Sequence, residues 1–163
     1  MDEGAAPAEA PGLDRQADDI DENALSRQLA VYGVAGQAKI KKSHVVVSGM
    51  GALGVEIAKN VCLAGVKAVT IHDSKHVTLA DVNGNFYLSP EDVGRNRAES
   101  TLSKLQLLNP AVTVRARTDD LSNLDGVTVM VATDMPLATQ LELNAACRAQ
   151  DIRFICSDIR GVL

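Results

Sequence analysis

Short apolar runs and longer amphipathic stretches alternate along most of this chain. Runs of strand length occupy residues 44–48, 67–73, 113–117, 127–134 and 152–161. Amphipathic stretches of helical length follow the first run at 52–64, the second at 95–109 and the fourth at 136–150. Alternating strands and helices predict an α/β fold with a Rossmann-like, doubly wound and mostly parallel sheet of about five strands. We expect the last strand to lack a covering helix.

The spacing of apolar residues also predicts which side of each helix faces the sheet. The expected inner faces are Leu102, Leu105 and Leu108 in one helix, and Leu137, Leu141 and Ala145 in another. Pro136 marks the start of the latter, because proline is favoured in the first helical turn. Gly65 is placed to end the helix at 52–64, because glycine readily adopts the left-handed conformation found after helices.

Three further segments define the domain boundaries. Residues 1–18 are rich in Ala, Pro and acidic residues, a composition typical of a disordered tail. Leu25, Leu29 and Tyr32 recur at helical spacing in the next segment, and a short helix is expected over 35–43. Residues 74–93 form a long polar connection without periodicity, and such loops are often functional. We therefore expect one domain over 19–163, incomplete at its C-terminus because the chain stops just after the fifth strand.

Composition supports this fold and excludes several classes of protein. Apolar residues make up 46% of the 163, with two Phe, two Tyr and no Trp, which suits helices packed on a parallel sheet. A net charge of −5 without a basic stripe argues against nucleic acid as a partner. We find no signal peptide, and no apolar run reaches the roughly 18 residues of a membrane helix. The expectation is a soluble intracellular protein.

The three cysteines are Cys62, Cys147 and Cys156. Their spacing matches neither a zinc site nor a CxxC redox motif. We expect three small buried thiols, none of them a nucleophile, because Cys62 lies at the wrong end of its helix for activation. No metal site is expected.

The chemistry concentrates in a glycine-rich turn between the first strand and its helix. Gly49, Gly51 and Gly54 form a GxGxxG pattern, and Asp73 ends the next strand 24 residues after Gly49. Such a turn brings backbone N–H groups and a helix N-terminus to a phosphate, while the acid binds a ribose. The pattern predicts a nucleotide-binding unit, and on this chemistry alone a nicotinamide-dependent oxidoreductase is the first hypothesis. The alternative is that the glycines serve packing only and that Asp73 is a solvated strand end.

Several motifs occur together and in order: "SRQL", "GMGALG", "HDSKHVTLADVNGNFYL", "DVGRNRAE", "LNPAV" and "VATD". This combination resembles the adenylating domains of the ubiquitin-activating enzyme superfamily, which are related to the bacterial adenylases of molybdopterin and thiamine synthesis. The stretches "DIDENALSRQLAVYG", "GVEIAKNVCLAGVKAVTIHD" and "SDIRG" look like the N-terminal half of the ubiquitin-activating enzymes. The resemblance spans about residues 19–163. The small subunit of the SUMO-activating heterodimer is an alternative within the superfamily.

The resemblance implies a specific role. In these ATP-dependent ligases two homologous adenylation domains pair, and the C-terminal half binds ATP, Mg²⁺ and the ubiquitin C-terminus. The N-terminal half is inactive and completes the pseudo-dimer, so this chain alone is expected to be inactive. Implied partners are the active half, ubiquitin and, through the full-length enzyme, ubiquitin-conjugating enzymes. The implied location is the cytoplasm and nucleus.

Matching the family motif residue by residue indicates why this half is the inactive one. Asp73 matches the ribose-binding aspartate, but Lys75 stands where the motif has a second aspartate. Gly84 stands in place of a phosphate-binding arginine. Arg97 occupies the position of a phosphate-contacting lysine, and Asp134 that of an aspartate that helps to hold Mg²⁺. Together with the three glycines these residues form a vestigial nucleotide site, although Asp134 also fits a helix N-cap.

Arg27 carries the remaining catalytic expectation. In the family, an arginine of the Ser-Arg-Gln motif reaches the ATP phosphates bound in the partner half. A guanidinium supplied in this way acts as an arginine finger. The alternative is an ordinary exposed arginine on an amphipathic helix.

Overall fold

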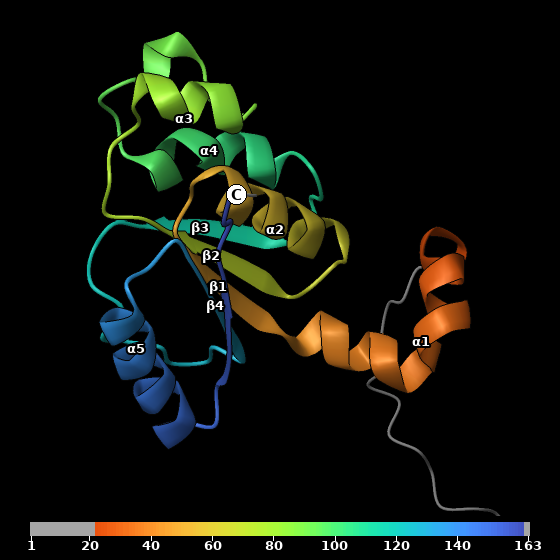
Figure 1. Cartoon of the computed structure of the whole chain (residues 1–163). Helices are drawn as coiled ribbons and strands as arrows, with labels where there is room; N and C mark the ends of the chain where they lie inside the picture. The colour runs from red at the N-terminus through yellow and green to blue at the C-terminus, as the bar shows by residue number, and fades with distance from the viewer. Residues whose placement is uncertain (1–21, 162–163) are drawn as a thin grey trace, which may run out of the picture. The chain divides into compact units, whose positions relative to one another are not determined.

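A five-stranded, fully parallel sheet lies at the centre of the structure, a computed structural model that describes residues 22–161 (Figure 1). The order across the sheet is β3-β2-β1-β4-β5. The strands are β1 (His44–Ser48), β2 (Ala68–His72), β3 (Thr113–Arg117), β4 (Val129–Thr133) and β5 (Arg153–Ser157). Each strand falls inside the apolar run that predicted it, and the predicted doubly wound α/β fold is confirmed.

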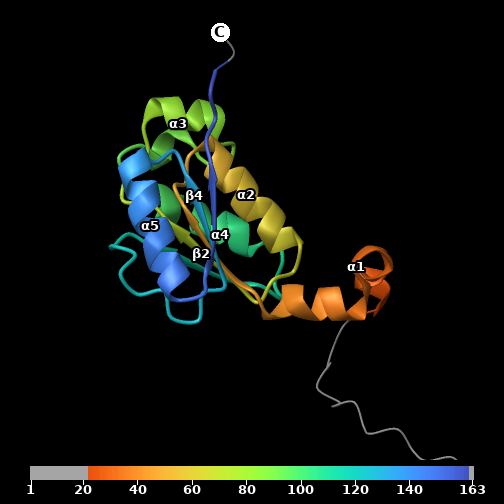
Figure 2. The same cartoon turned by 60° about the horizontal axis from the view of Figure 1, so that its bottom comes forward.

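Helices cover both faces of this sheet. α2 (Ala52–Leu63) and α4 (Arg97–Gln106) lie on one face, and α5 (Leu137–Ala149) lies on the other (Figures 1 and 2). Because alternate strand residues point to opposite faces, Val45 and Val47 join the core under α2, whereas Val46 joins the core under α5. Leu105 of α4 is fully buried, and Leu102 and Leu108 pack partly buried against the same core, as predicted.

The inner face predicted for α5 is wrong. Leu137 and Leu141 are 68% and 60% exposed, and Ala145 is also exposed. The residues that meet the sheet are Cys147, which is buried, and Leu143, which is partly buried. These two lie four positions apart and so share one side of the helix. Apolar residues occur all around α5, so spacing alone did not determine which side turns inward.

The connection at 74–93 is more ordered than predicted. It contains α3 (Leu79–Gly84) and a short 3₁₀ helix at Pro90–Asp92. Thr78 caps α3: its hydroxyl accepts from the backbone N–H of Asp81, and the Asp81 carboxylate accepts from the backbone N–H of Thr78. A helix of six residues is too short to show hydrophobic periodicity, and here the cap supplies the stabilisation.

α1 (Glu22–Lys42) contains the two helical segments expected before the sheet, separated at Gly33, whose φ of 67° and ψ of 171° break the helix. The structure divides into two compact units between Ala38 and Lys39, so most of α1 lies in the first unit and the whole sheet in the second. The predicted tail at 1–18 lies outside the described residues. No helix within residues 22–161 has both the length and the apolar character of a membrane-spanning segment.

The cysteines depart from expectation at one position. Cys62 and Cys147 are buried, and burial raises the pKa of both thiols, that of Cys62 to about 11. Thiols that stay protonated at neutral pH are poor nucleophiles. Cys156 is exposed on the edge strand β5, so the prediction of a third buried thiol is wrong. β5 is an edge strand, and Ile155 beside Cys156 is also exposed.

Candidate functional site

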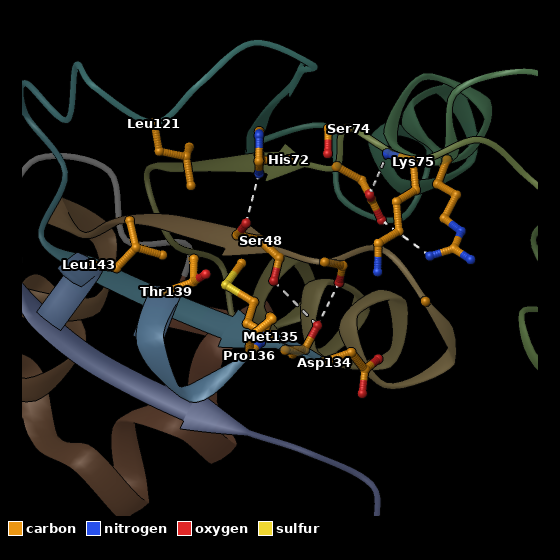
Figure 3. A pocket seen from close by; sticks show the side chains of 15 residues that line it. Ser48, His72, Ser74, Lys75, Leu121, Asp134, Met135, Pro136, Thr139 and Leu143 are labelled. Carbon is orange, nitrogen blue, oxygen red and sulfur yellow. Dashed lines mark hydrogen bonds and ion pairs between the residues drawn. The ribbon is translucent and has the colours of Figure 1, made fainter. Parts of the chain in front are cut away.

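A pocket of about 310 Å³ opens at the carboxyl ends of β1, β2 and β4. β2 lies on one side of β1 and β4 on the other, so the strand order changes direction at β1. Ligands of doubly wound sheets usually bind at the carboxyl ends of the strands at such a point. Figure 3 shows Leu121, Thr139 and Leu143 at one end and Lys75 and Asp134 at the other. The pocket therefore has a largely apolar end and a charged end.

The three glycines of the turn have different roles. A Cβ atom on Gly54 would lie 1.7 Å from the carbonyl oxygen of Gly49, and one on Gly49 would lie 2.4 Å from Thr133 Oγ1. Thr133 Oγ1 in turn donates a hydrogen bond to the Gly49 carbonyl at 2.7 Å. Gly49 and Gly54 are thus required for close packing of turn, helix and β4. Gly49 and Gly51 line the pocket, whereas Gly54 does not.

Asp73 holds the glycine turn through its carboxylate. Oδ2 accepts a 2.8 Å hydrogen bond from the backbone N–H of Met50, and Oδ1 accepts one of 2.8 Å from that of Lys75. The residue is only 5% exposed, so it is not a solvated strand end. It lines the pocket wall beside the turn.

The guanidinium of Arg97 is paired with acids. Nη2 lies 2.7 Å from Asp81 Oδ1 and 2.9 Å from Asp81 Oδ2, and Nη1 lies 3.8 Å from Asp73 Oδ2. Nε is buried without a hydrogen-bond partner. Burial alone would raise the pKa of the Asp81 carboxyl, but hydrogen bonds from Thr78 and Arg97 outweigh it and lower that pKa. Arg97 reaches the pocket wall, but its charge is largely neutralised.

The start of α4 places Arg97 there. Asn96 caps α4 by accepting hydrogen bonds from the backbone N–H groups of Ala98 and Glu99. Its side-chain amide donates to the carbonyl oxygen of Asp73 at 2.7 Å. The first turn of α4 is therefore tied to the end of β2, where the pocket begins.

Besides Arg97, the charged end of the pocket has one lysine among the described residues. Lys75 lines the pocket, and its ammonium makes no ion pair or hydrogen bond with the described residues. Gly84 packs against the first residue of α2, since an added Cβ would lie 3.2 Å from Ala52 Cβ. The position that holds arginine in the family motif thus offers the pocket no charge.

Asp134 follows β4 in a left-handed conformation, with φ of 52°. Its backbone N–H donates to Asp158 Oδ1 at 3.0 Å, and its side chain is exposed. Pro136, not Asp134, is the N-cap of α5, and no side chain caps this helix, so the N-cap interpretation of Asp134 is wrong. Within residues 22–161 no group of three His, Cys, Asp or Glu side chains is arranged to hold a metal ion.

Several pocket residues were not predicted. Ser48 Oγ lies 2.7 Å from His72 Nδ1 (Figure 3). His72 Nε2 lies 2.7 Å from the carbonyl oxygen of Asp119. Since that carbonyl only accepts, Nε2 carries the proton and Ser48 donates to Nδ1. These hydrogen bonds link the ends of β1 and β2 to the loop that carries Leu121. The sequence could have predicted this contact, because a serine ends one strand and a histidine ends the next. The carboxyl ends of neighbouring parallel strands lie at the same edge of the sheet.

The structure brings together Gly49, Gly51, Asp73, Arg97 and Asp134 around one pocket. Arg27 is exposed on α1 and belongs to the first unit, whereas the pocket lies wholly in the second. The pocket offers an apolar surface and a carboxylate, which suit a nucleoside. It does not offer the fixed cations that a triphosphate requires, because Arg97 is paired and Gly84 carries no side chain.

The model of the ThiF family matches residues 25–162, which is most of the chain. Ubiquitin-activating enzyme E1 1 of Triticum aestivum is 48% identical over 148 residues, 88% of this chain and 14% of that protein. Ubiquitin-like modifier-activating enzyme 6 of Homo sapiens is 43% identical over 169 residues, 98% of this chain and 16% of that protein. The chain thus spans about a seventh of the length of these relatives.

Solved structures show the same fold at lower sequence identity. E. coli tRNA N6-threonylcarbamoyladenosine dehydratase, TcdA, in complex with ATP, is 20% identical with a TM-score of 0.72. The match covers 83% of this chain and 58% of TcdA. E. coli MccB is also 20% identical, with a TM-score of 0.70 over 83% of this chain and 45% of MccB. Neither the family model nor these relatives lends support to the nicotinamide-dependent oxidoreductase hypothesis.

Proposed function

Because this chain belongs to the ThiF family and is part of an adenylation domain of the ubiquitin-activating type, we propose that it is the inactive half of such a domain pair. In this role it supports ATP-dependent adenylation of ubiquitin, or of a related modifier, by an active half. It does not carry out the reaction itself. The active half binds ATP and Mg²⁺, and the full-length enzyme passes the modifier to conjugating enzymes in the cytoplasm and nucleus.

The neutralised Arg97 is the observation that carries this proposal. Adenylation moves negative charge between phosphate groups, and enzymes stabilise that charge with several fixed cations. Here the guanidinium is held by Asp81 at 2.7 Å and faces Asp73 at 3.8 Å. Lys75 is the one lysine or arginine of the described pocket wall that has no acidic partner. A single flexible ammonium does not make a triphosphate clamp.

The pocket retains the nucleoside part of the ancestral site. Asp73 and the glycine turn keep their mutual hydrogen bonding, and Leu121 and Leu143 supply apolar surface. A glycine turn that keeps its geometry without a phosphate clamp is consistent with an architectural role. In that role the turn holds α2 against β1 and β4. The nucleoside pocket is then a remnant that binds nucleotides weakly.

We propose a direct catalytic role only for Arg27. Its side chain is exposed, and its guanidinium makes no hydrogen bond or ion pair with the described residues. A guanidinium without a partner among the described residues is available for phosphates bound by another domain. Acting in this way, Arg27 stabilises the negative charge that develops when the modifier carboxylate attacks the α-phosphate of ATP.

ATP–pyrophosphate exchange tests both parts of the proposal. The 163-residue chain with ubiquitin is expected to show no exchange above background. In the full-length enzyme, Arg27→Ala is expected to lower exchange by about 1,000-fold, the size typical of an arginine finger. Arg148→Ala, at an exposed arginine on α5 outside the pocket, is the matched control and should leave the rate unchanged. Exchange by the chain alone would refute its inactivity, and an unchanged rate in Arg27→Ala would refute the trans role.

A further inference from the structure

A second, basic pocket lies at the amino ends of β1, β2 and β3, on the edge of the sheet opposite the nucleoside pocket. It has a volume of about 260 Å³, and its lining includes the basic residues Lys42, His44, Lys67 and Arg115. The rest of its wall is formed by Ala68, Thr113 and Gly126. Among the residues that the structure describes, no Asp or Glu lines it.

The fold brings these basic residues together from three separate segments. The backbone N–H of Lys67 donates to the Ser43 carbonyl at 3.0 Å, and the Lys67 carbonyl accepts from the N–H of Thr113 at 3.3 Å. Strand pairing then aligns His44 with Ala68 and Ala68 with Thr113 in one row across the sheet. Arg115 lies two residues beyond Thr113 and so points to the same face. The cluster is a product of sheet register and is not visible as a basic run in the sequence.

The basic residues of this pocket form no ion pair with the described residues, whereas five other basic side chains do. Arg95, Arg97, Arg117 and Arg160 each lie within an ion pair with an aspartate, and Lys59 pairs with Glu56. Within residues 22–161, Lys42, Lys67 and Arg115 have no ion pair, although the whole chain carries 21 acidic against 16 basic residues. Lys42 complements the helix dipole at the end of α1, but this does not explain the other two.

The pKa of His44 is sensitive to the positive charges of the neighbouring basic residues. Its Nε2 lies 2.8 Å from Thr70 Oγ1, which fixes the ring at the pocket wall. The pKa of His44 is lowered first by burial and further by the charges of Arg115 and Lys67, against a hydrogen bond with the Gly126 backbone that raises it. An adjoining pocket shares His44 and Arg115 with the basic pocket and has two carboxylates in its wall: Asp119, which pairs with Arg117, and Asp125. The positive charge of the basic pocket therefore has no counter-charge in its own wall.

We propose that this basic pocket binds a small, multiply charged phosphate anion, of the size of a polyphosphate or a polyphosphorylated metabolite. A concave site with three unpaired cations from three segments fits an anion that accepts from several donors at once. An extended nucleic acid fits less well, because the cations form one compact group on a chain of net charge −5. The site is independent of the proposed adenylation role.

Titration of the 163-residue chain with inorganic tripolyphosphate, followed by calorimetry and backbone amide NMR shifts, tests the proposal. We expect saturable binding that weakens as salt concentration rises, with the largest shifts at Lys67, Thr113 and Gly126. Lys67→Gln and Arg115→Gln should each weaken binding by about tenfold, the loss expected for one charge-assisted contact. Arg153→Gln, a matched change at the amino end of β5 outside the pocket, should leave affinity unchanged.

Three results would overturn the proposal. The first is no saturable binding, and the second is binding that Lys67→Gln and Arg115→Gln leave unchanged. The third is binding weakened by Lys75→Gln instead, which would place the anion in the nucleoside pocket. Two comparison titrations identify the source of the phosphate. Tighter binding of an inositol polyphosphate than of tripolyphosphate would support a metabolite ligand, whereas tighter binding of a single-stranded oligonucleotide would contradict a small-anion site.

Discussion

Arg97 lies at the pocket wall with its guanidinium between Asp81 and Asp73, and this arrangement determines what the residue does. Sequence position alone marks Arg97 as a phosphate ligand, because the family motif has a lysine there. The ion pairs turn it into a structural residue that ties α4 to α3 and to the end of β2. Its partner Asp81 is 16 positions away, so the pairing was not readable from the sequence.

Replacing Asp81 with asparagine tests this structural role. Asp81→Asn keeps one acceptor oxygen for the cap but removes the negative charge that pairs with Arg97, so we expect the free energy of unfolding to fall by about 2 kcal/mol at pH 7. The pKa of Asp81 in the folded protein lies below its ordinary value of 3.8. Its stabilisation is therefore complete above pH 3.8 and is lost as pH falls through the folded value.

Urea unfolding at pH 7 and pH 3 measures both effects. The wild-type chain should lose more stability between these pH values than Asp81→Asn does. Asp119→Asn is the matched control, because Asp119 is 65% exposed and its pair with Arg117 should contribute little. If Asp81→Asn is as stable as the wild type, the Arg97 contacts do not hold this region together.

The glycines of the turn give a second test at the level of single residues. Gly54→Ala places a Cβ where the Gly49 carbonyl oxygen lies, 1.7 Å away, and should lower the free energy of unfolding by about 3 kcal/mol. Gly51→Ala, in the same turn, brings its Cβ only to 3.3 Å from Asp134 Oδ2 and should cost less than about 1 kcal/mol. Equal losses, measured by urea unfolding, would contradict the packing role of Gly54.

At the level of helices, α4 and α5 show when periodicity predicts an inner face. In α4 the leucines recur on one side of an otherwise polar helix, and Leu105 is fully buried as expected. In α5 apolar residues surround the helix, and the small residue Cys147 rather than a leucine meets the sheet most closely. Leu137 and Leu141 remain exposed. Apolar spacing predicts orientation only where polar residues define the opposite side.

Two leucine-to-alanine changes test this difference. Leu105→Ala should lower the free energy of unfolding by about 3 kcal/mol, because it leaves a cavity in the core. Leu141→Ala, at a side chain 60% exposed, should change it by less than about 0.5 kcal/mol. Both are measured by urea unfolding of the same chain. A large loss in Leu141→Ala would show that α5 buries the side that the sequence predicted.

At the level of the whole molecule, the position of the pocket follows from topology. The alternation of strands and helices was enough to predict the parallel sheet, and GxGxxG followed by Asp73 was enough to predict which residues lie together at the pocket. The state of the site depends on contacts that no local pattern encodes: Arg97 with Asp81, Gly84 against Ala52, and His72 with Ser48 and Asp119. Strand register likewise assembles the basic pocket from Lys42, Lys67 and Arg115.

The central claim is that the pocket keeps a nucleoside site without a triphosphate clamp, and calorimetric titration with AMP and with Mg²⁺-ATP tests it most directly. Without fixed cations, the β- and γ-phosphates add little to the binding free energy. We therefore predict that the two nucleotides bind the 163-residue chain with dissociation constants within about tenfold of each other. Binding of ATP that is 100-fold or more tighter than that of AMP would contradict the claim. Such a result would mean that Arg97 or Lys75 holds the triphosphate after all.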